Sequence, residues 1–178
     1  LHGCGRSTLR ERVEWVRSVA RVLRRRRASL IAAMVLDAGK RVSEADGEVS
    51  EAIDFAEYYL RQAEELGRDK SLVARPRGVT LVTSPWNFPL AIPLSGVLAG
   101  LLAGSPVLFK PALETAFVGE QLCAAAWDAG VPREALQLLL CRDEVGTLLL
   151  RHAAVRGVVL TGATSTARFF LETRPSMH

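Results

Sequence analysis

Cysteine and histidine are scarce in this sequence. Its 178 residues include three cysteines (Cys4, Cys123, Cys141) and three histidines (His2, His152, His178). Their spacing matches no metal-ligand motif, so we expect no metal site. An odd number of irregularly spaced cysteines does not indicate a disulfide framework and fits a reducing compartment, so we predict a cytoplasmic protein.

The sequence also lacks a long apolar segment. No apolar run approaches the ~20 residues of a membrane span, and the first four residues have no apolar core of the kind that a signal peptide needs. We therefore expect no membrane partner. The first residue is Leu1 and not methionine, from which we expect that the sequence begins inside a longer chain.

Aromatic residues are few, and this scarcity bears on nucleic acid as a partner. The net charge of +4 favours such a partner, but aromatics make up only 6% of the residues. No predicted strand carries a pair of aromatics for base stacking. Basic residues are spread along the chain except at positions 24–27, which we place on the solvated face and last turn of a helix. We expect no nucleic-acid partner, with binding through these four arginines kept as an alternative.

Apolar residues make up 49% of the chain, enough for one globular domain with its own core. The N-terminal part has helical patterns. Thr8-Leu-Arg-Glu11 matches a capping box ahead of an amphipathic helix. A second helix is predicted over residues 29–38, ended by Gly39, and a third from about 43–46 to Gly67. We interpret the carboxylates of this third helix, Glu48 among them, as a solvated face.

After a polar connector at residues 67–77 the pattern changes to alternating strands and helices. Strands are predicted over residues 79–83, 107–109, 136–140 and 157–161, and helices over 90–102, 115–129, 144–152 and 164–172. This order predicts an α/β fold: a parallel sheet with helices on both faces and right-handed crossovers.

The first of these strands ends in a loop stiffened by proline. Ser-Pro-Trp-Asn-Phe-Pro occupies residues 84–89. The prolines fix their own φ and restrict Ser84 and Phe88 before them. Ligands of open α/β sheets bind at the carboxyl ends of the strands, so we interpret Asn87 as positioned for function. In an arbitrary protein such a segment is more often a plain turn, with Trp86 as a core anchor and Asn87 as a helix cap.

The other strand ends also carry groups that suit a ligand. Lys110 follows the second strand, Gly146 lies after the third, and Gly162-Ala-Thr164 opens the last helix. A helix N-terminus with small residues presents free N–H groups to a phosphate. The usual Gly-x-Gly-x-x-Gly fingerprint of dinucleotide sites is absent.

Together these motifs resemble the aldehyde dehydrogenase superfamily. The 84–89 loop is similar to the family's signature loop, Phe109-Lys-Pro-Ala112 to its lysine segment, and Leu160-Thr-Gly-Ala-Thr164 to its Phe-Thr-Gly-Ser-Thr segment. Residues 34–40 and 49–59 resemble the branch of 1-pyrroline-5-carboxylate (glutamate semialdehyde) dehydrogenases, which includes a module of bifunctional proline-utilisation proteins. The resemblance covers nearly the whole chain and implies a Rossmann-like NAD-binding domain.

The resemblance implies a role for several residues. The Asn87 side-chain amide would help to form the oxyanion hole, because the reaction needs a neutral donor that is already oriented when charge develops. Other loop residues would wall the nicotinamide pocket, the lysine would bind the adenosine ribose, and the last helix would meet the pyrophosphate. The predicted cofactor-binding residues are Ser84, Pro85, Trp86, Lys110, Glu114, Gly146, Gly162 and Ala163.

The sequence departs from the family at three places in the cofactor site. The acidic residue expected three positions after the lysine is Leu113, with Glu114 one later; the pyrophosphate serine is Ala163; and residues 140–143 replace a glycine-rich bend. Each lost hydrogen bond to a charged ligand costs roughly 1.5–3 kcal/mol. We therefore expect weakened NAD binding unless Glu114 substitutes for the missing acid, and the choice between NAD and NADP stays open.

The resemblance places the family's general-base glutamate and nucleophilic cysteine beyond His178. We interpret Cys123 as a core residue, and Cys141 has no histidine to activate it. Residues 1–178 are thus predicted to form a single incomplete NAD-binding domain, with a helical segment (1–74) and a sheet portion (75–178).

The implied full-length protein is a homo-oligomer that oxidises glutamate semialdehyde, a small-molecule aldehyde, to glutamate. The alternative is a non-catalytic, decayed or split copy that keeps the fold.

Overall fold

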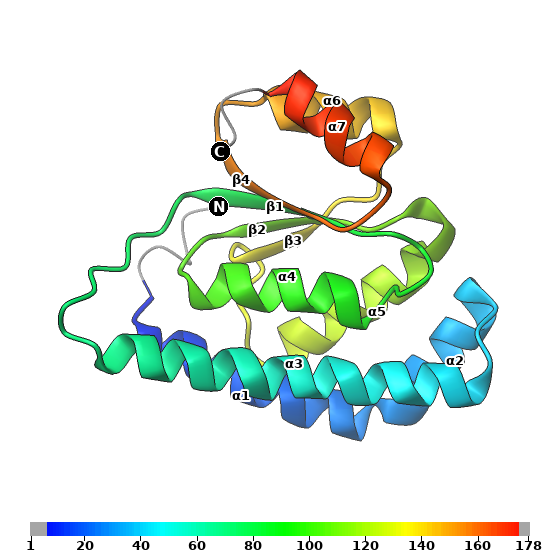
Figure 1. Ribbon diagram of the computed structural model, residues 1–178. Coiled ribbons are helices and arrows are strands. Elements are labelled where there is room, and N and C mark those ends of the chain that lie inside the picture. Colours follow the sequence, from blue (N-terminus) through cyan, green and yellow to red (C-terminus); the bar gives the residue numbers. More distant parts are fainter. Residues whose placement is uncertain (1–6, 175–178) are drawn as a thin grey trace.

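The computed structural model describes residues 7–174. Helices and strands alternate after three N-terminal helices (Figure 1). In chain order the elements are α1 (Leu9–Arg25), α2 (Arg27–Ala38), α3 (Val42–Arg68), β1 (Val79–Thr83), α4 (Ala91–Leu102), β2 (Val107–Lys110), the 3-10 turn η2 (Leu113–Thr115), α5 (Ala116–Asp128), β3 (Leu136–Leu138), α6 (Asp143–Arg151), β4 (Val155–Leu160) and α7 (Thr164–Thr173).

The four strands form one parallel sheet in the order β3-β2-β1-β4. The predicted α/β fold class is therefore confirmed. The chain leaves β1 for β2 on one side and returns for β4 on the other side. Such a reversal of strand order opens a crevice at the carboxyl ends of the strands, which is where open α/β sheets bind ligands.

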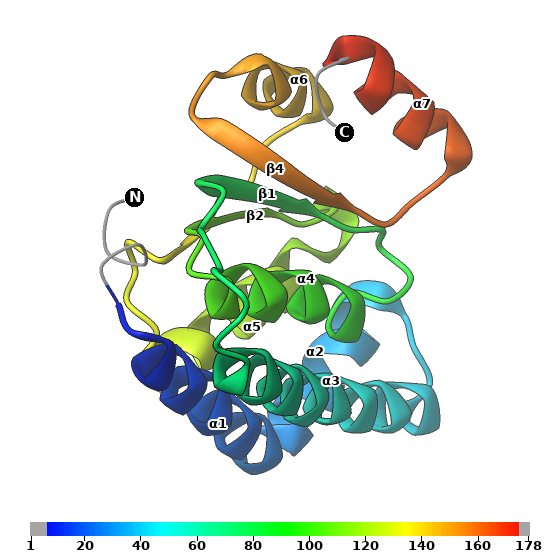
Figure 2. The ribbon, with the colours of Figure 1, turned by 60° about the vertical axis from the view of Figure 1, so that its left-hand side comes forward.

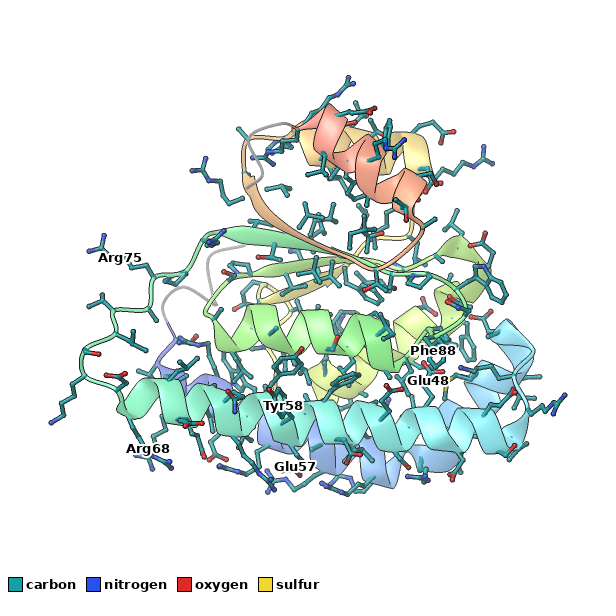
Figure 3. All side chains as sticks on the ribbon, viewed as in Figure 1. Glu48, Glu57, Tyr58, Arg68, Arg75 and Phe88 are labelled. Carbon is teal, nitrogen blue, oxygen red and sulfur yellow. The ribbon has the colours of Figure 1, made fainter. Side chains whose placement is uncertain are left out.

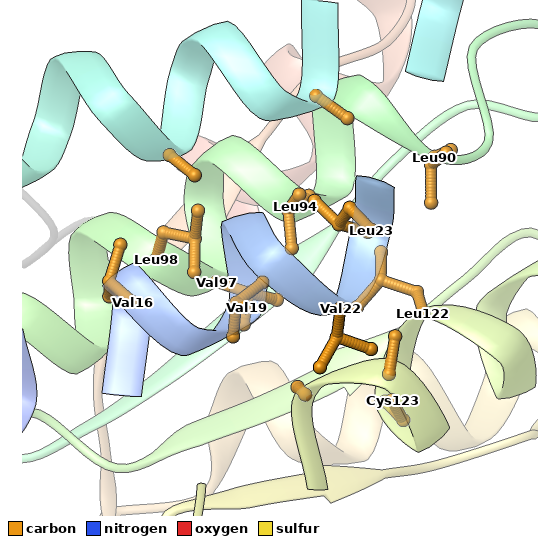
Figure 4. Packing of buried hydrophobic residues seen from close by; sticks show 14 of the residues in the cluster. Val16, Val19, Val22, Leu23, Leu90, Leu94, Val97, Leu98, Leu122 and Cys123 are labelled. Carbon is orange, nitrogen blue, oxygen red and sulfur yellow. The ribbon is translucent and has the colours of Figure 1, made fainter. Parts of the chain in front are cut away.

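Helices cover both faces of the sheet, but unequally (Figures 1 and 2). On one face α4 and α5 lie against the strands, with α1, α2 and α3 beneath them; on the other face lie α6 and α7. The main hydrophobic core is on the first side and includes buried residues of α1, α3, α4 and α5 (Figure 4). A small second cluster, Leu81, Leu150 and Val155, lies on the other side.

Local sequence signals correctly predict the start of α1 and the end of α2, whereas α2 begins at Arg27, two residues before its predicted start. The Thr8 hydroxyl accepts a hydrogen bond from the Glu11 amide at 3.2 Å, and the Glu11 carboxylate accepts one from the Thr8 amide at 2.6 Å, which confirms the capping box. These hydrogen bonds hold the pKa of Glu11 below its usual value. Gly39 ends α2 with a φ of 65°, a left-handed conformation that favours glycine.

Three of the four arginines at positions 24–27 join helices. Arg24 forms an ion pair with Glu57 of α3 at 2.9 Å, Arg26 with Asp128 of α5, and Arg27 with Asp46 of α3. Arg24 and Arg25 lie in the last turn of α1 as predicted, whereas Arg26 lies between the two helices and Arg27 begins α2. The charges of Arg24, Arg26 and Arg27 are therefore partly neutralised by neighbouring carboxylates.

Some predicted boundaries are wrong by one or two residues. β4 begins at Val155 and not at residue 157, so Gly157 lies within the strand and does not begin it. Gly157 lies against the Thr80 side chain, beside an irregularity in the register between β1 and β4. β3 ends at Leu138, two residues early, and a 3-10 turn precedes α5.

Within residues 7–174, no helix is long and apolar enough to cross a membrane, and no cluster of His, Cys, Asp and Glu side chains could hold a metal ion. Cys4, His2 and His178 lie outside the described residues.

Candidate functional site

A hollow of about 500 Å³ lies at the carboxyl ends of β1, β2 and β4. We call it the strand-end hollow. Its walls come from the loops after these strands, from the start of α6 and from the start of α7. The lining residues are Thr83, Ser84, Pro85, Trp86, Lys110, Ala112, Leu113, Glu114, Arg142, Asp143, Glu144, Leu160, Thr161, Gly162, Ala163 and Thr166. A second hollow of about 500 Å³ adjoins it and shares Thr83, Lys110, Asp143, Glu144 and Thr166.

Lys110 is the charged centre of the strand-end hollow. It is the last residue of β2, its side chain is only 10% exposed, and its ammonium donates a hydrogen bond to the Asp143 carboxylate at 3.0 Å. The Asp143 side chain is 97% exposed, so this partner is free to turn towards solvent. Lys110 is therefore a buried hydrogen-bond donor. A ligand in the hollow can accept its hydrogen bond in place of the Asp143 carboxylate.

Gly146 lies directly against Lys110. A Cβ atom on Gly146 would be 3.2 Å from the Lys110 Cε and 3.4 Å from its Cδ. Gly146 lines the adjoining hollow together with Lys110. The absence of a side chain at this position thus leaves room for the aliphatic stem of the lysine beneath α6.

The start of α7 forms the opposite wall. Gly162 and Ala163 line the strand-end hollow, and Ala163 is the N-cap residue of α7 with no side-chain hydrogen bond to the helix. A serine or aspartate at an N-cap commonly accepts a hydrogen bond from the first turn, and alanine has no such acceptor. The first N–H groups of α7 therefore face the hollow without a side-chain cap.

Leu113 and Glu114 both line the strand-end hollow, and both are exposed. They belong to the 3-10 turn η2, which follows directly after β2 and the Lys110-Pro-Ala112 segment. Glu114 lies one position later than the acidic residue of the family pattern. It nevertheless lines the same wall of the strand-end hollow as Leu113, which occupies the family position.

The 84–89 loop separates two hollows. Ser84 is buried, and Trp86 is 55% exposed and lines both of them. One of the two is the strand-end hollow. The other, of about 510 Å³, lies beside α3, and we call it the α3 hollow; Asn87 lines this one and not the strand-end hollow. The lining residues of the α3 hollow are Ala38, Gly39, Lys40, Glu44, Gly47, Glu48, Glu51, Trp86, Asn87 and Phe88. The structure thus gathers seven of the eight predicted cofactor residues in the strand-end hollow, Gly146 next to it, and Asn87 on the other side of Trp86.

Two details of the plain-turn interpretation of this loop are wrong. Trp86 is exposed and anchors no core, and the first turn of α4 is capped by Glu48 instead of Asn87. The expectation that Glu48 belongs to a solvated face is also wrong, because this residue is only 2% exposed. Nothing in the local sequence marks it, since its partners on α4 are more than 40 positions away.

Neither described cysteine is an activated nucleophile. Cys123 is fully buried in α5, and burial raises the pKa of its thiol to about 12. Cys141 lies near Lys110, but partial burial outweighs that positive charge and also raises its thiol pKa. Both thiols are free and are protonated at neutral pH.

Comparison with protein-family profiles matches residues 2–176 to the aldehyde dehydrogenase family. Over 158 residues, 88% of the chain, it is 41% identical to the Bifunctional protein PutA of Salmonella typhimurium, and over 164 residues it is 37% identical to 1-pyrroline-5-carboxylate dehydrogenase 1 of Halalkalibacterium halodurans. The match covers 12% of the first relative and 32% of the second, so the chain spans only part of their length.

Solved structures show the same similarity. Proline Utilization A of Corynebacterium freiburgense superposes with a TM-score of 0.90 at 38% identity, over 99% of this chain and 19% of that one. The D779Y mutant of the Bradyrhizobium japonicum protein gives a TM-score of 0.92 at 34% identity, over 98% and 19%.

Proposed function

The chain belongs to the aldehyde dehydrogenase family, and from that premise we propose that it is the cofactor-binding part of an enzyme that oxidises glutamate semialdehyde, the open form of 1-pyrroline-5-carboxylate, to glutamate. The names of its relatives support this substrate. We propose that residues 1–178 act as one domain; helices from the 1–74 and 75–178 portions share the main hydrophobic core, which supports this.

The single observation that carries the proposal is the strand-end hollow with Lys110 inside it. Lys110 ends a buried strand, its side chain is only 10% exposed, and its partner Asp143 is an almost fully exposed carboxylate, so a ligand in the hollow would add hydrogen bonds to a largely desolvated charge. The hollow and its neighbour offer two connected spaces of about 500 Å³ each, which suits an elongated dinucleotide. Bound NAD would supply the acceptor for the hydride that leaves the substrate.

Each part of the hollow suits a different part of this cofactor. We propose that Lys110 donates to the ribose hydroxyls and that the uncapped N–H groups of α7, reached past Gly162 and Ala163, bind the pyrophosphate. Ser84, Pro85 and Trp86 would form the wall next to the nicotinamide. Gly146 would act indirectly, by leaving room for Lys110.

We propose NAD in preference to NADP. The carboxylates of Glu114, Asp143 and Glu144 all line the strand-end hollow around Lys110. An acidic group near the ribose accepts hydrogen bonds from its hydroxyls and repels a 2′-phosphate. Glu114 would take the place of the acidic residue that the family has one position earlier.

Asn87 would serve the substrate side. It lines the α3 hollow and not the strand-end hollow, so a cofactor in one and an aldehyde in the other would meet at the 84–89 loop. We propose that its neutral amide donates to the substrate oxygen as that oxygen gains negative charge. We propose that neither Cys123 nor Cys141 is the nucleophilic thiol, because both are protonated at neutral pH, and that the nucleophile and the general base are supplied by other residues of the full enzyme.

Calorimetric titration of the chain with NAD tests the proposal. We expect saturable binding, weakened about tenfold or more by Lys110→Ala because a charge-assisted hydrogen bond is lost. NADP should bind more weakly than NAD. Lys70→Ala is the matched control, since Lys70 is exposed in the connector after α3, and this variant should bind NAD like the unmodified chain.

Two outcomes would contradict the proposal. No heat at millimolar NAD would mean that the strand-end hollow is no working cofactor site, and would favour the non-catalytic module. Binding that Lys110→Ala and Lys70→Ala weaken equally would place the cofactor elsewhere.

A further inference from the structure

The segment around Asn87 is bound by an ion pair from the N-terminal helices. Lys40 precedes α3, and Glu48 lies in its second turn. The Lys40 ammonium donates to the Glu48 carboxylate, and their side chains are only 12% and 1% exposed. Figure 3 shows Glu48 next to Phe88, where α3 passes beneath the loop.

Glu48 binds the loop on the C-terminal side of Pro89. Its Oε1 accepts hydrogen bonds from the backbone N–H of Leu90 at 2.8 Å and of Ala91 at 3.0 Å. These are free donors at the start of α4, where the helix dipole favours a negative charge. A buried carboxylate is tolerated only when it is paired and hydrogen-bonded, and Glu48 satisfies both conditions with these two amides and Lys40.

Lys40 binds the loop on the N-terminal side of Pro89. Its ammonium donates to the backbone carbonyl of Asn87 at 3.0 Å and lies 4.1 Å from the centroid of the Phe88 ring. The same two side chains therefore hold the carbonyl of Asn87 and the amides of Leu90 and Ala91. Pro89, which lies between them, has no backbone N–H to donate.

We infer that Lys40 and Glu48 are positioning residues that fix the backbone of Asn87, and through it the position of its amide. This inference rests on the proposed role of Asn87 as the oxyanion donor. The Asn87 side chain is exposed, so the place from which its amide reaches out is set by the backbone that carries it. A donor set in advance stabilises developing charge better than one that must reorient, and the ion pair supplies that preorganisation from a different part of the chain.

NMR spectroscopy of the full 178-residue chain without cofactor tests this inference. Lys40→Met removes the ammonium, so the carbonyl ¹³C shift of Asn87 should change and the order parameters of residues 86–88 should fall. Lys40→Arg keeps a cationic donor and should restore both. Glu48→Gln keeps an acceptor but loses the charge that holds Lys40; we expect the same carbonyl shift change, and about tenfold faster amide exchange at Leu90 and Ala91.

Asp37→Asn is the matched control. The Asp37 carboxylate of α2 accepts a hydrogen bond from the Val118 amide in the first turn of α5 at 3.0 Å, so it also caps a helix from another element, but it does not contact the loop. This variant should leave the Asn87 shift and the 86–88 order unchanged. If Glu48→Gln does not fold, comparison of Lys40→Met with Lys40→Arg still tests the positioning role.

The inference is wrong if Lys40→Met lowers the melting temperature but leaves the Asn87 shift and the order of residues 86–88 unchanged. It is equally wrong if Asp37→Asn loosens the loop as much as Lys40→Met does. The measurement needs no NAD, so a chain that fails to bind NAD refutes the proposed function without touching this result. Conversely, a chain that binds NAD but keeps a rigid loop in Lys40→Met refutes only the positioning role.

Discussion

At the scale of single residues, the two described cysteines both have a raised thiol pKa but differ in their exposure to solvent. Cys123 is fully buried, with a thiol pKa of about 12, whereas Cys141 is partly exposed with a more modestly raised pKa. Because the thiolate is the reactive form, we expect iodoacetamide at pH 7.5 to label Cys141 slowly and Cys123 not at all. Raising the pH to 9 should speed labelling of Cys141 by increasing its thiolate fraction. Peptide mass spectrometry resolves each site.

Unfolding the chain in guanidinium provides the control for this experiment. Both cysteines should then react at similar rates, because burial no longer protects Cys123 or raises its pKa. Rapid labelling of Cys141 at neutral pH in the folded chain would show an activated thiol, and would contradict the view that the nucleophile comes from elsewhere.

Single residues also show which parts of the site the sequence could predict. Lys110 and Gly162 were found because each follows a recognisable strand, and strand ends meet at one edge of a parallel sheet. Glu48 was not found, because it lies among other carboxylates on a regular helix and only its partners distinguish it. Side chains placed by local order are thus predictable, whereas a group buried by contact with distant elements is not.

At the scale of elements, α4 depends on glycines where it approaches the sheet. A Cβ atom on Gly100 would lie 2.7 Å from the Val107 Cγ2, and Val107 is fully buried in β2. Gly100→Ala should therefore push α4 away from the strand and destabilise the chain by about 1–3 kcal/mol, less the gain in helix propensity. Thermal and urea unfolding followed by circular dichroism measure this change.

Gly47→Ala is the matched control for this helix packing. Gly47 lies within α3, is exposed, and a Cβ atom there would meet nothing within 4 Å. Its replacement should stabilise the chain by about 0.5–1 kcal/mol, since alanine loses less backbone entropy in a helix than glycine does. If both variants shift stability in the same direction, close packing of α4 is not what makes glycine necessary at position 100.

Element types were easier to predict than element ends. The sequence of α4 is apolar on all sides of the helix, which is typical of a helix buried between a sheet and other helices. By contrast, β3 pairs with only one neighbour and ends two residues early, while Gly157 was mistaken for the start of β4. Strand ends are set by pairing with the neighbouring strand, which the local sequence does not encode.

At the scale of the whole molecule, the two faces of the sheet carry very different amounts of core. The main cluster joins α1, α3, α4 and α5, whereas the second contains only Leu81, Leu150 and Val155 among its fully buried members. α7 has no buried residue, and among its side chains only Phe170 packs against that small cluster. Local stability follows buried apolar contact, so the α6–α7 side should open more readily than the rest.

Native-state hydrogen exchange should therefore divide the molecule along the sheet. We expect the amides of α7 to exchange on the order of a hundredfold faster than those of α4, a helix of similar length, because α7 can detach without disturbing the main core. α6 should exchange at intermediate rates, since its Leu150 is fully buried. Mass spectrometry of peptic fragments is sufficient to compare the three helices. Equal protection of α4 and α7 would mean that the sheet and both helical layers unfold as one unit, and that the small core beneath α6 and α7 does not limit local stability.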